Sequence, residues 1–167
     1  YNQSLVASLI AADGADAAET WARGLVANMA RPPQGGDRDQ IKAAAAGQCD
    51  IAIANTYYLA GMLTSADETE RAAAEGVAVY WPNQRGRGVH VNVSGAAVTK
   101  SARHKQAAIA LLEFLASDPS QKWYAETNGE YPVRPGITVS PALAAWGEFK
   151  ADDLNLAQLG ELNAEAV

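Results

Sequence analysis

The sequence predicts an α/β fold in which helices cover a partly parallel sheet. Three helical patterns are followed by an apolar run, a further helix, two more extended runs and then helices again, and this alternation is typical of α/β proteins. The length of 167 residues suits about one domain, and an apolar fraction of 49% is sufficient for a core. We find no internal repeat.

The N-terminal part of the chain is predicted to form three helices. Apolar residues recur at helical spacing over residues 3–12 and again over residues 15–30. A loop with two prolines and two glycines follows. Asp37, followed three residues later by Gln40, has the form of a capping box and is expected to begin the third helix, which ends at Gly47.

A buried strand followed by a capped helix is predicted next. Ile51 to Ala54 form a short apolar run, which is typical of a buried strand. Asn55 and Thr56 end this run, and both residue types cap helices because their side-chain oxygens accept hydrogen bonds from free backbone N–H groups. A helix is therefore expected over residues 57–63.

Two further strands are expected downstream. Residues 64–75 are polar and acidic and predict a solvated helix, after which residues 77–81 form an apolar run. Residues 89–93 alternate apolar and polar side chains, as a half-buried strand does. The loop between these runs contains Arg85 and Arg87 among glycines, and this suits either an anion site or a mobile surface loop.

The remaining residues are predicted to be mainly helical. Residues 105–116 form an amphipathic pattern whose leucines are expected to face inward. Asp118 before Pro119 is a capping residue followed by proline at the first helical position, and the helix that begins there is expected to end near Gly129. Two short helices follow, the first of them beginning at Ser140.

Composition argues against several classes of protein. The chain has 13 basic and 19 acidic residues, a net charge of −6, and no basic stripe, so a nucleic-acid partner is not expected. No apolar run approaches the roughly 20 residues that span a bilayer. The single cysteine, Cys49, cannot form an internal disulfide. The chain begins at Tyr1 without methionine or a signal-peptide pattern, and we expect a piece of a longer protein or a trimmed form.

The tyrosine pair Tyr57 and Tyr58 is the strongest functional feature. It lies where the predicted strand gives way to a helix, and ligands of α/β sheets bind beyond the carboxyl ends of strands. Adjacent helical residues point about 100° apart, so both phenols reach one centre only at the mouth of the helix. A phenolate is a hard oxygen donor that suits highly charged cations. On spacing alone, the alternative is one core and one surface tyrosine.

No catalytic pattern accompanies this pair. Phosphate-binding glycine motifs, HExxH and the nucleophile elbow are absent from the sequence. His90 and His104 are isolated, and each is expected to be a structural or surface residue. The sequence therefore favours a binding function over catalysis.

The residues around the pair resemble the bacterial periplasmic ferric-iron-binding proteins, also called bacterial transferrins, which are the substrate-binding components of iron ABC transporters. The motif Gly47-Gln-Cys-Asp-Ile-Ala-Ile-Ala-Asn-Thr-Tyr-Tyr58 carries this resemblance most strongly. The resemblance implies an α/β, type II periplasmic-binding-protein-like fold, of which this chain forms mostly one lobe of two. The further segments that resemble the family are residues 27–35, 81–84, 91–97, 112–115 and 130–133.

The resemblance also implies a set of ligands for Fe(III). Tyr57 and Tyr58 take the role of the paired tyrosine ligands, and Tyr1, which opens a helix in a similar segment, takes that of a third. Some relatives also bind a synergistic anion such as carbonate, and the replacement of the small residues expected after Tyr1 leaves open whether one is required here. The residues implied in holding an anion or orienting the ligands are Asn55, Asn2 and Gln3.

Family members are considerably longer than this chain, so the resemblance implies a missing N-terminal lobe. Residues 1–88 would form the core of the C-terminal lobe and carry the tyrosine ligands. Residues 89–134 would be a crossover segment that packs with the missing lobe, and residues 135–167 would be helices that return to the first. The implied protein is periplasmic, is not an enzyme, and delivers iron to the permease of an ABC importer in the inner membrane.

Two other functions stay open at this point. A type II binding protein for an organic anion or sugar would use the tyrosines for stacking or hydrogen bonding. Such a complex would lack the visible absorption of phenolate bound to Fe(III). An enzyme with tyrosine as general acid or base would need a tuned partner within hydrogen-bond reach, and the sequence shows none.

Overall fold

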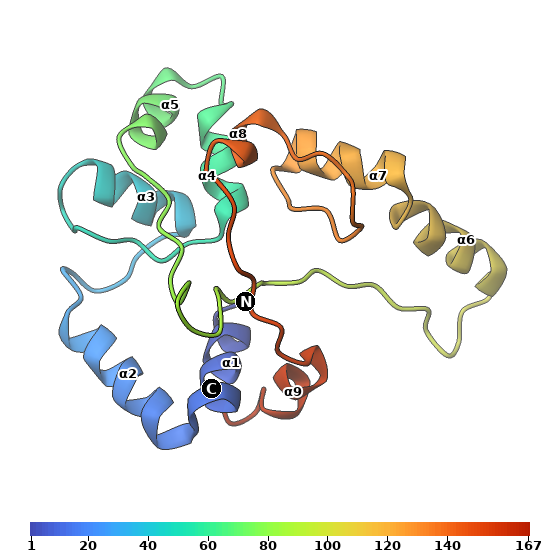
Figure 1. The fold of residues 1–167 in the computed structure, drawn as a ribbon, viewed down its shortest axis with the longest axis horizontal. Coiled ribbons are helices and arrows are strands. Elements are labelled where there is room, and N and C mark those ends of the chain that lie inside the picture. The colour runs from blue at the N-terminus through green and yellow to red at the C-terminus, as the bar shows by residue number, and fades with distance from the viewer. The chain divides into compact units, whose positions relative to one another are not determined.

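The computed structural model describes all 167 residues and consists of helices joined by irregular segments (Figure 1). No helix is both long enough and apolar enough to cross a bilayer. The helices are α1 (Asn2–Asp13), α2 (Ala15–Ala27), α3 (Asp37–Ala45), α4 (Thr56–Leu63), α5 (Glu68–Glu75), α6 (Lys105–Leu115), α7 (Asp118–Trp123), the π-helix η1 (Tyr124–Asn128), α8 (Pro141–Ala144) and α9 (Leu156–Glu161).

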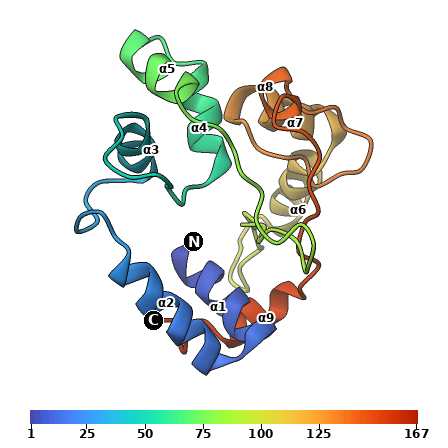
Figure 2. The same ribbon diagram turned by 60° about the vertical axis from the view of Figure 1, so that its left-hand side comes forward.

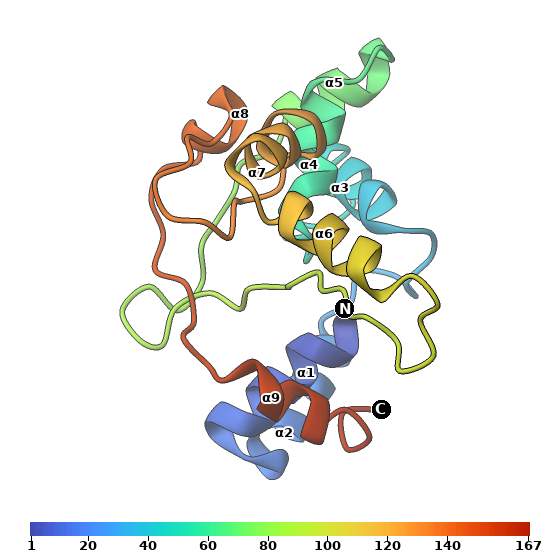
Figure 3. The ribbon, with the colours of Figure 1, turned by 90° about the vertical axis from the view of Figure 1, so that its right-hand side faces the viewer.

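The chain divides into two compact units. The first unit consists of Tyr1–Gln34, Tyr80–Val93 and Phe149–Val167, and the second unit consists of Gly35–Val79 and Ser94–Glu148. In the first unit, α1 packs against α2 and α9 (Figures 2 and 3). The second unit contains α3 to α8 together with η1.

An ion pair closes the first unit. Arg87 Nη1 lies 2.6 Å from Asp152 Oδ2 and also donates to the Ser8 carbonyl oxygen at 3.1 Å. Beside this pair, Val89 and Ala151 form an isolated parallel β-bridge. The sequence left open whether the arginine loop is an anion site or a mobile surface loop. Arg87 takes neither role, because its side chain binds Ser8 of α1 and Asp152 of the C-terminal segment.

The core of the second unit lies between α3, α4 and α5. These helices contact one another, and their buried apolar side chains are Ile41, Leu59, Met62 and Ala74. On the outside of this group, Glu70 of α5 accepts from Arg38 at 3.1 Å and from Lys42 at 2.9 Å, both on α3. The helix that bears the tyrosines is therefore held by a packed core on one side.

The three predicted strands are not present as strands. Residues 51–54, 77–81 and 89–93 run as irregular chain, and the bridge at Val89 is the only ladder contact in the structure. The predictions were wrong because a strand needs hydrogen bonds to a neighbouring strand, which an apolar pattern alone does not provide. Ile51 and Tyr80 are 81% and 86% exposed, whereas Ala54, Val77 and Val79 of the same segments pack against the core of the second unit.

The amphipathic helix α6 differs from its prediction in packing rather than in position. The expected bounds, residues 105–116, agree with the observed helix to within one residue. None of its residues is buried. Of the leucines expected to face inward, Leu112 and Leu115 are half-buried, but Leu111 is 56% exposed, so the expectation is wrong for Leu111. Phe114 on the same helix is 61% exposed. The only element that it packs against is α7, which leaves its apolar side uncovered within this chain.

Candidate metal centre

The two tyrosines lie in the first turn of α4, which begins at Thr56 after the N-cap residue Asn55. Their ring centroids are 4.6 Å apart, and the ring planes are inclined by 42°. Both side chains are half-buried, so the alternative of one core and one surface tyrosine does not hold. The structure thus brings Tyr57 and Tyr58 together at the mouth of the helix.

The N-cap residue is held by an acidic side chain from another helix. The backbone N–H of Asn55 donates to Asp37 Oδ2 at 2.8 Å, and Asn55 Nδ2 lies 3.5 Å from the same oxygen. The Asn55 side chain makes no capping hydrogen bond to α4, so the expected mode of capping is wrong although the position is right.

The predicted role of Asp37 as the cap of its own helix is also wrong. Gly36 occupies the N-cap of α3, and its backbone N–H donates to Asp39 Oδ2 at 2.8 Å. Because Asp39 serves this helix end, Asp37 is left to point inward, where it is buried. A capping pattern in sequence cannot distinguish a carboxylate that serves its own helix from one that serves a distant segment.

Tyr57 lies in surroundings that disfavour its charged form. Burial, a hydrogen bond with Tyr58, and the negative charges of Tyr58, Asp37 and Glu130 together raise the pKa of Tyr57 to about 12. The phenol is therefore protonated at neutral pH, and a cation must displace the proton to bind the oxygen. A highly charged metal ion can do this, as metal ions do for bound water and thiols.

A glycine packs directly behind the tyrosine helix. Gly129 ends η1 with a φ of 66°, in the left-handed region that favours glycine. A Cβ at this position would collide with the Cβ of Ala60 and would lie 3.8 Å from the Cα of Tyr57. The close approach of η1 to α4 therefore depends on the missing side chain.

We expect Gly129→Ala to destabilise the second unit more than Gly147→Ala does. Gly147 also has a positive φ, 75°, but a Cβ there would meet nothing within 4 Å. Left-handed backbone alone costs alanine about 1–2 kcal/mol, and the collision with Ala60 adds about 1–3 kcal/mol of overpacking. Urea unfolding of both variants measures the difference, and equal losses would contradict the close packing of η1 on α4.

The residues predicted around Tyr1 belong to the first unit. Tyr1 is the N-cap of α1 and is 53% exposed, and Asn2 and Gln3 form the first turn of that helix. Their part in a metal centre stays a prediction.

The sequence did not indicate that two acidic residues, Asp37 and Glu130, lie near Tyr57. Asp37 is separated from Asn55 by 18 positions, and its sequence signal was that of an ordinary helix cap. Glu130 lies in one of the segments that resemble the family, but nothing in the sequence relates it to Tyr57. Its proximity follows from the fold of η1 against α4.

The histidines show no arrangement with other ligand residues. His90 Nε2 lies 3.0 Å from Ser4 Oγ, and burial lowers the pKa of His90. His104 is exposed at the N-cap of α6. No group of three or more His, Cys, Asp or Glu side chains in the structure is placed to hold a metal ion.

Residues 3–151 match the family of bacterial extracellular solute-binding proteins. The chain belongs to this family. Among curated members, it is 49% identical over 166 residues to iron uptake protein A1 of Synechocystis, an alignment that covers 99% of this chain and 46% of the relative. It is 26% identical to the Fe(3+)-binding periplasmic protein of Serratia marcescens, with coverage of 94% and 45%. The chain spans about half the length of these relatives.

Solved structures of family members superpose closely on the chain. A Trichodesmium protein in complex with iron and citrate matches with a TM-score of 0.95 and 50% identity, over 99% of this chain and 52% of that one. The ferric binding protein of Campylobacter jejuni matches with a TM-score of 0.94 and 36% identity, over 98% and 52%. These matches confirm the predicted fold class, an α/β fold of the type II periplasmic-binding-protein kind, and the resemblance to ferric-iron-binding proteins.

Proposed function

We propose that the chain binds ferric iron as cargo through the phenolates of Tyr57 and Tyr58. The observation that carries this proposal is the pair of half-buried phenols, with ring centroids 4.6 Å apart, on the first turn of one helix. It is supported by the names of the relatives, which include iron uptake and ferric-iron-binding proteins. Hard phenolate oxygens would neutralise much of the charge of Fe(III), which favours it over Fe(II).

Further donors complete the proposed centre. Tyr1 would supply a third phenolate, and Asn55, Asn2 and Gln3 would orient the ligands or hold an anion such as carbonate. The Trichodesmium structure contains citrate with its iron, so an anion accompanies the metal in that relative.

The proposed protein is a periplasmic carrier rather than an enzyme. The chain belongs to the bacterial extracellular solute-binding proteins. We propose that it delivers iron to the permease of an ABC importer in the inner membrane. We further propose that residues 1–88 belong to the C-terminal lobe, that residues 89–134 pack with a missing N-terminal lobe, and that residues 135–167 return to the first. The uncovered apolar side of α6 supports this arrangement, because it lies in the crossover segment.

A spectroscopic titration tests the proposal directly. Ferric nitrilotriacetate is added to the chain, and a visible phenolate-to-Fe(III) charge-transfer band is expected to grow to saturation. An organic anion or sugar as the true ligand would give no such band. A chain that neither develops the band nor retains iron on gel filtration would refute ferric binding.

We expect ferric affinity to fall steeply as the pH is lowered. Because the pKa of Tyr57 is raised to about 12, its phenol carries a proton at every pH below this value and must lose that proton to bind iron. Each such phenol makes the association constant fall by about tenfold per pH unit. Competition with a chelator between pH 7.5 and 5.5, corrected for protonation of the chelator, measures the slope. A flat profile would contradict phenolate ligation.

A further inference from the structure

The position of the tyrosine helix depends on a contact that its own residues do not make. The first N–H groups of any helix lack partners within it, and the N-cap is the flanking residue that joins the helix to the preceding chain. Here the N-cap, Asn55, has extended backbone, with φ −75° and ψ 139°, before α4 begins. Its N–H is bound by Asp37 Oδ2 at 2.8 Å, and its side-chain nitrogen lies 3.5 Å from that oxygen.

Asp37 is itself held firmly. It is only 8% exposed and begins α3, whose N-cap N–H is bound by Asp39. Behind it, Ile41 of α3 and Leu59 of α4 belong to one buried core. A carboxylate on such a fixed helix is a strong acceptor for a backbone N–H, because charged hydrogen bonds are stronger than neutral ones.

We propose that Asp37 is a positioning residue of the tyrosine centre, which fixes the N-cap of α4 and through it the direction of the two phenols. This inference rests on the proposed ferric function. Asp37 acts through Asn55 and is not a ligand. Groups that orient ligands in this way are commonly worth 10- to 100-fold in metal affinity.

The test compares two acidic residues of the same helix. Asp37→Ala removes the acceptor of the Asn55 N–H, whereas Asp39→Ala removes an acceptor that also binds a backbone N–H at 2.8 Å, that of Gly36, but serves only α3. In the full 167-residue chain, Asp37→Ala is expected to lower ferric affinity at least tenfold and to shift the charge-transfer band. Asp39→Ala is expected to keep the band and to change affinity less than twofold.

A conservative variant guards against simple unfolding. Asp37→Asn retains an oxygen of the same shape that can accept the Asn55 N–H, so its band is expected to stay in place and its affinity to recover most of the loss. Equal behaviour of Asp37→Asn and Asp37→Ala would overturn the proposal. Equal behaviour of Asp37→Ala and Asp39→Ala in both band and affinity would do the same.

A measurement made without iron tests the positioning role of Asp37 independently of the proposed ferric function. Hydrogen exchange at the Asn55 amide, followed by NMR, is expected to accelerate at least tenfold in Asp37→Ala and to stay unchanged in Asp39→Ala. If the unaltered chain gives no ferric band, the proposed function fails, and the exchange rates still decide whether Asp37 holds the start of α4. Unchanged exchange at Asn55 in Asp37→Ala would overturn the positioning role.

Discussion

Tyr57→Phe and Tyr58→Phe are each expected to lower ferric affinity by more than about a hundredfold. The loss exceeds that expected for a group that merely orients a ligand, because the proposed ligand oxygen itself is deleted. Each change removes only the hydroxyl oxygen, so the ring contact between the two residues and the packing of α4 are preserved. Chelator competition measures the affinity, and the visible band reports the phenolates that remain.

A matched control comes from a tyrosine outside the candidate centre. Tyr80 belongs to the first unit and is 86% exposed, so Tyr80→Phe is expected to leave both affinity and band unchanged. Circular dichroism and thermal unfolding check that all three variants keep the fold. If either Tyr57→Phe or Tyr58→Phe binds iron as tightly as Tyr80→Phe, with the same band, that residue is not a ligand.

The second large effect on ferric affinity is expected from a second lobe, the part of the family fold that this chain does not span. The chain supplies three proposed phenolates at most, from Tyr1, Tyr57 and Tyr58, whereas an octahedral ion takes about six oxygen or nitrogen donors. A closing lobe would add donors and exclude water, which strengthens every charge interaction in the site. We therefore expect the chain alone to bind ferric iron measurably, but much more weakly than a two-lobed protein.

A chimera measures this difference. The N-terminal half of a relative such as iron uptake protein A1 is joined before Tyr1, and its ferric affinity is compared with that of the chain by chelator competition. Hydrogen exchange of α6 is recorded in both proteins, and its protection is expected to increase in the chimera because the uncovered apolar side becomes packed. Equal affinities would mean that the site is complete within this chain, and the model of a cleft between two lobes would fail.

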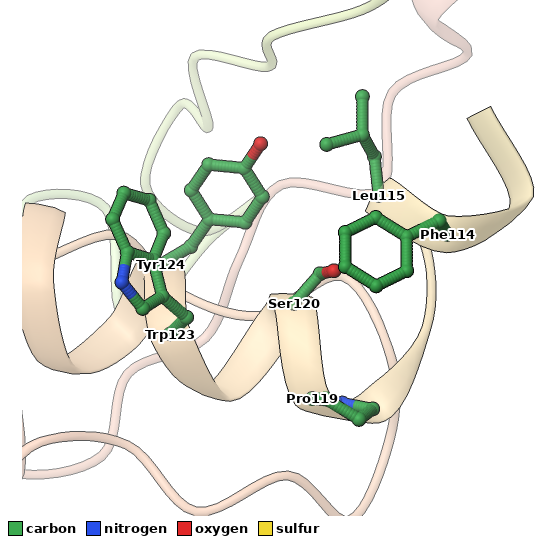
Figure 4. Close-up of a pocket in the computed structure, with 6 residues that line it drawn as sticks. All are labelled: Phe114, Leu115, Pro119, Ser120, Trp123 and Tyr124. Atoms are coloured by element: carbon green, nitrogen blue, oxygen red, sulfur yellow. The ribbon is translucent and has the colours of Figure 1, made fainter. Parts of the chain in front are cut away.

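A hollow beside α6 agrees with the expectation that a second lobe packs on this side of the chain. The hollow has a volume of about 420 Å³. It is lined by residues of α6 and α7 and by the first residue of η1, and most of these side chains are apolar (Figure 4). Phe114 and Trp123, two of these side chains, are 61% and 53% exposed. The chain spans about half of these relatives, and a second lobe of the kind proposed above would cover this surface.

Helices could be predicted from the sequence because their determinants are local. The spacing of apolar residues in α1 and the proline at the start of α7 act within a few positions of each other. The strand predicted at residues 51–54 is absent from the structure, because a strand's hydrogen bonds depend on a partner outside the segment, which the local pattern does not specify. Its apolar pattern still agrees with the confirmed α/β class of the family.

The tyrosine pair could be found in the sequence, but its surroundings could not. Two adjacent tyrosines at a helix start are visible as a pattern, and the structure places them at that position. The contacts of Asp37 with Asn55, and of Gly129 with Ala60, join segments that are distant in the chain. Neither leaves a local signal, because a capping residue and a helix-ending glycine have the same appearance whatever they touch.

The division of the chain has a consequence for the order in which it folds. The first unit is assembled from three separate stretches, and its closing ion pair joins Arg87 to Asp152, near the end of the chain. The second unit is complete once Glu148 has been synthesised, so it can fold before α9, which packs against α1, has been made. Contacts between α1 and α9 close a loop of nearly the whole chain, and such distant contacts form slowly. We therefore expect the tyrosine helix to reach its final packing before the N-terminal helix that carries Tyr1 does.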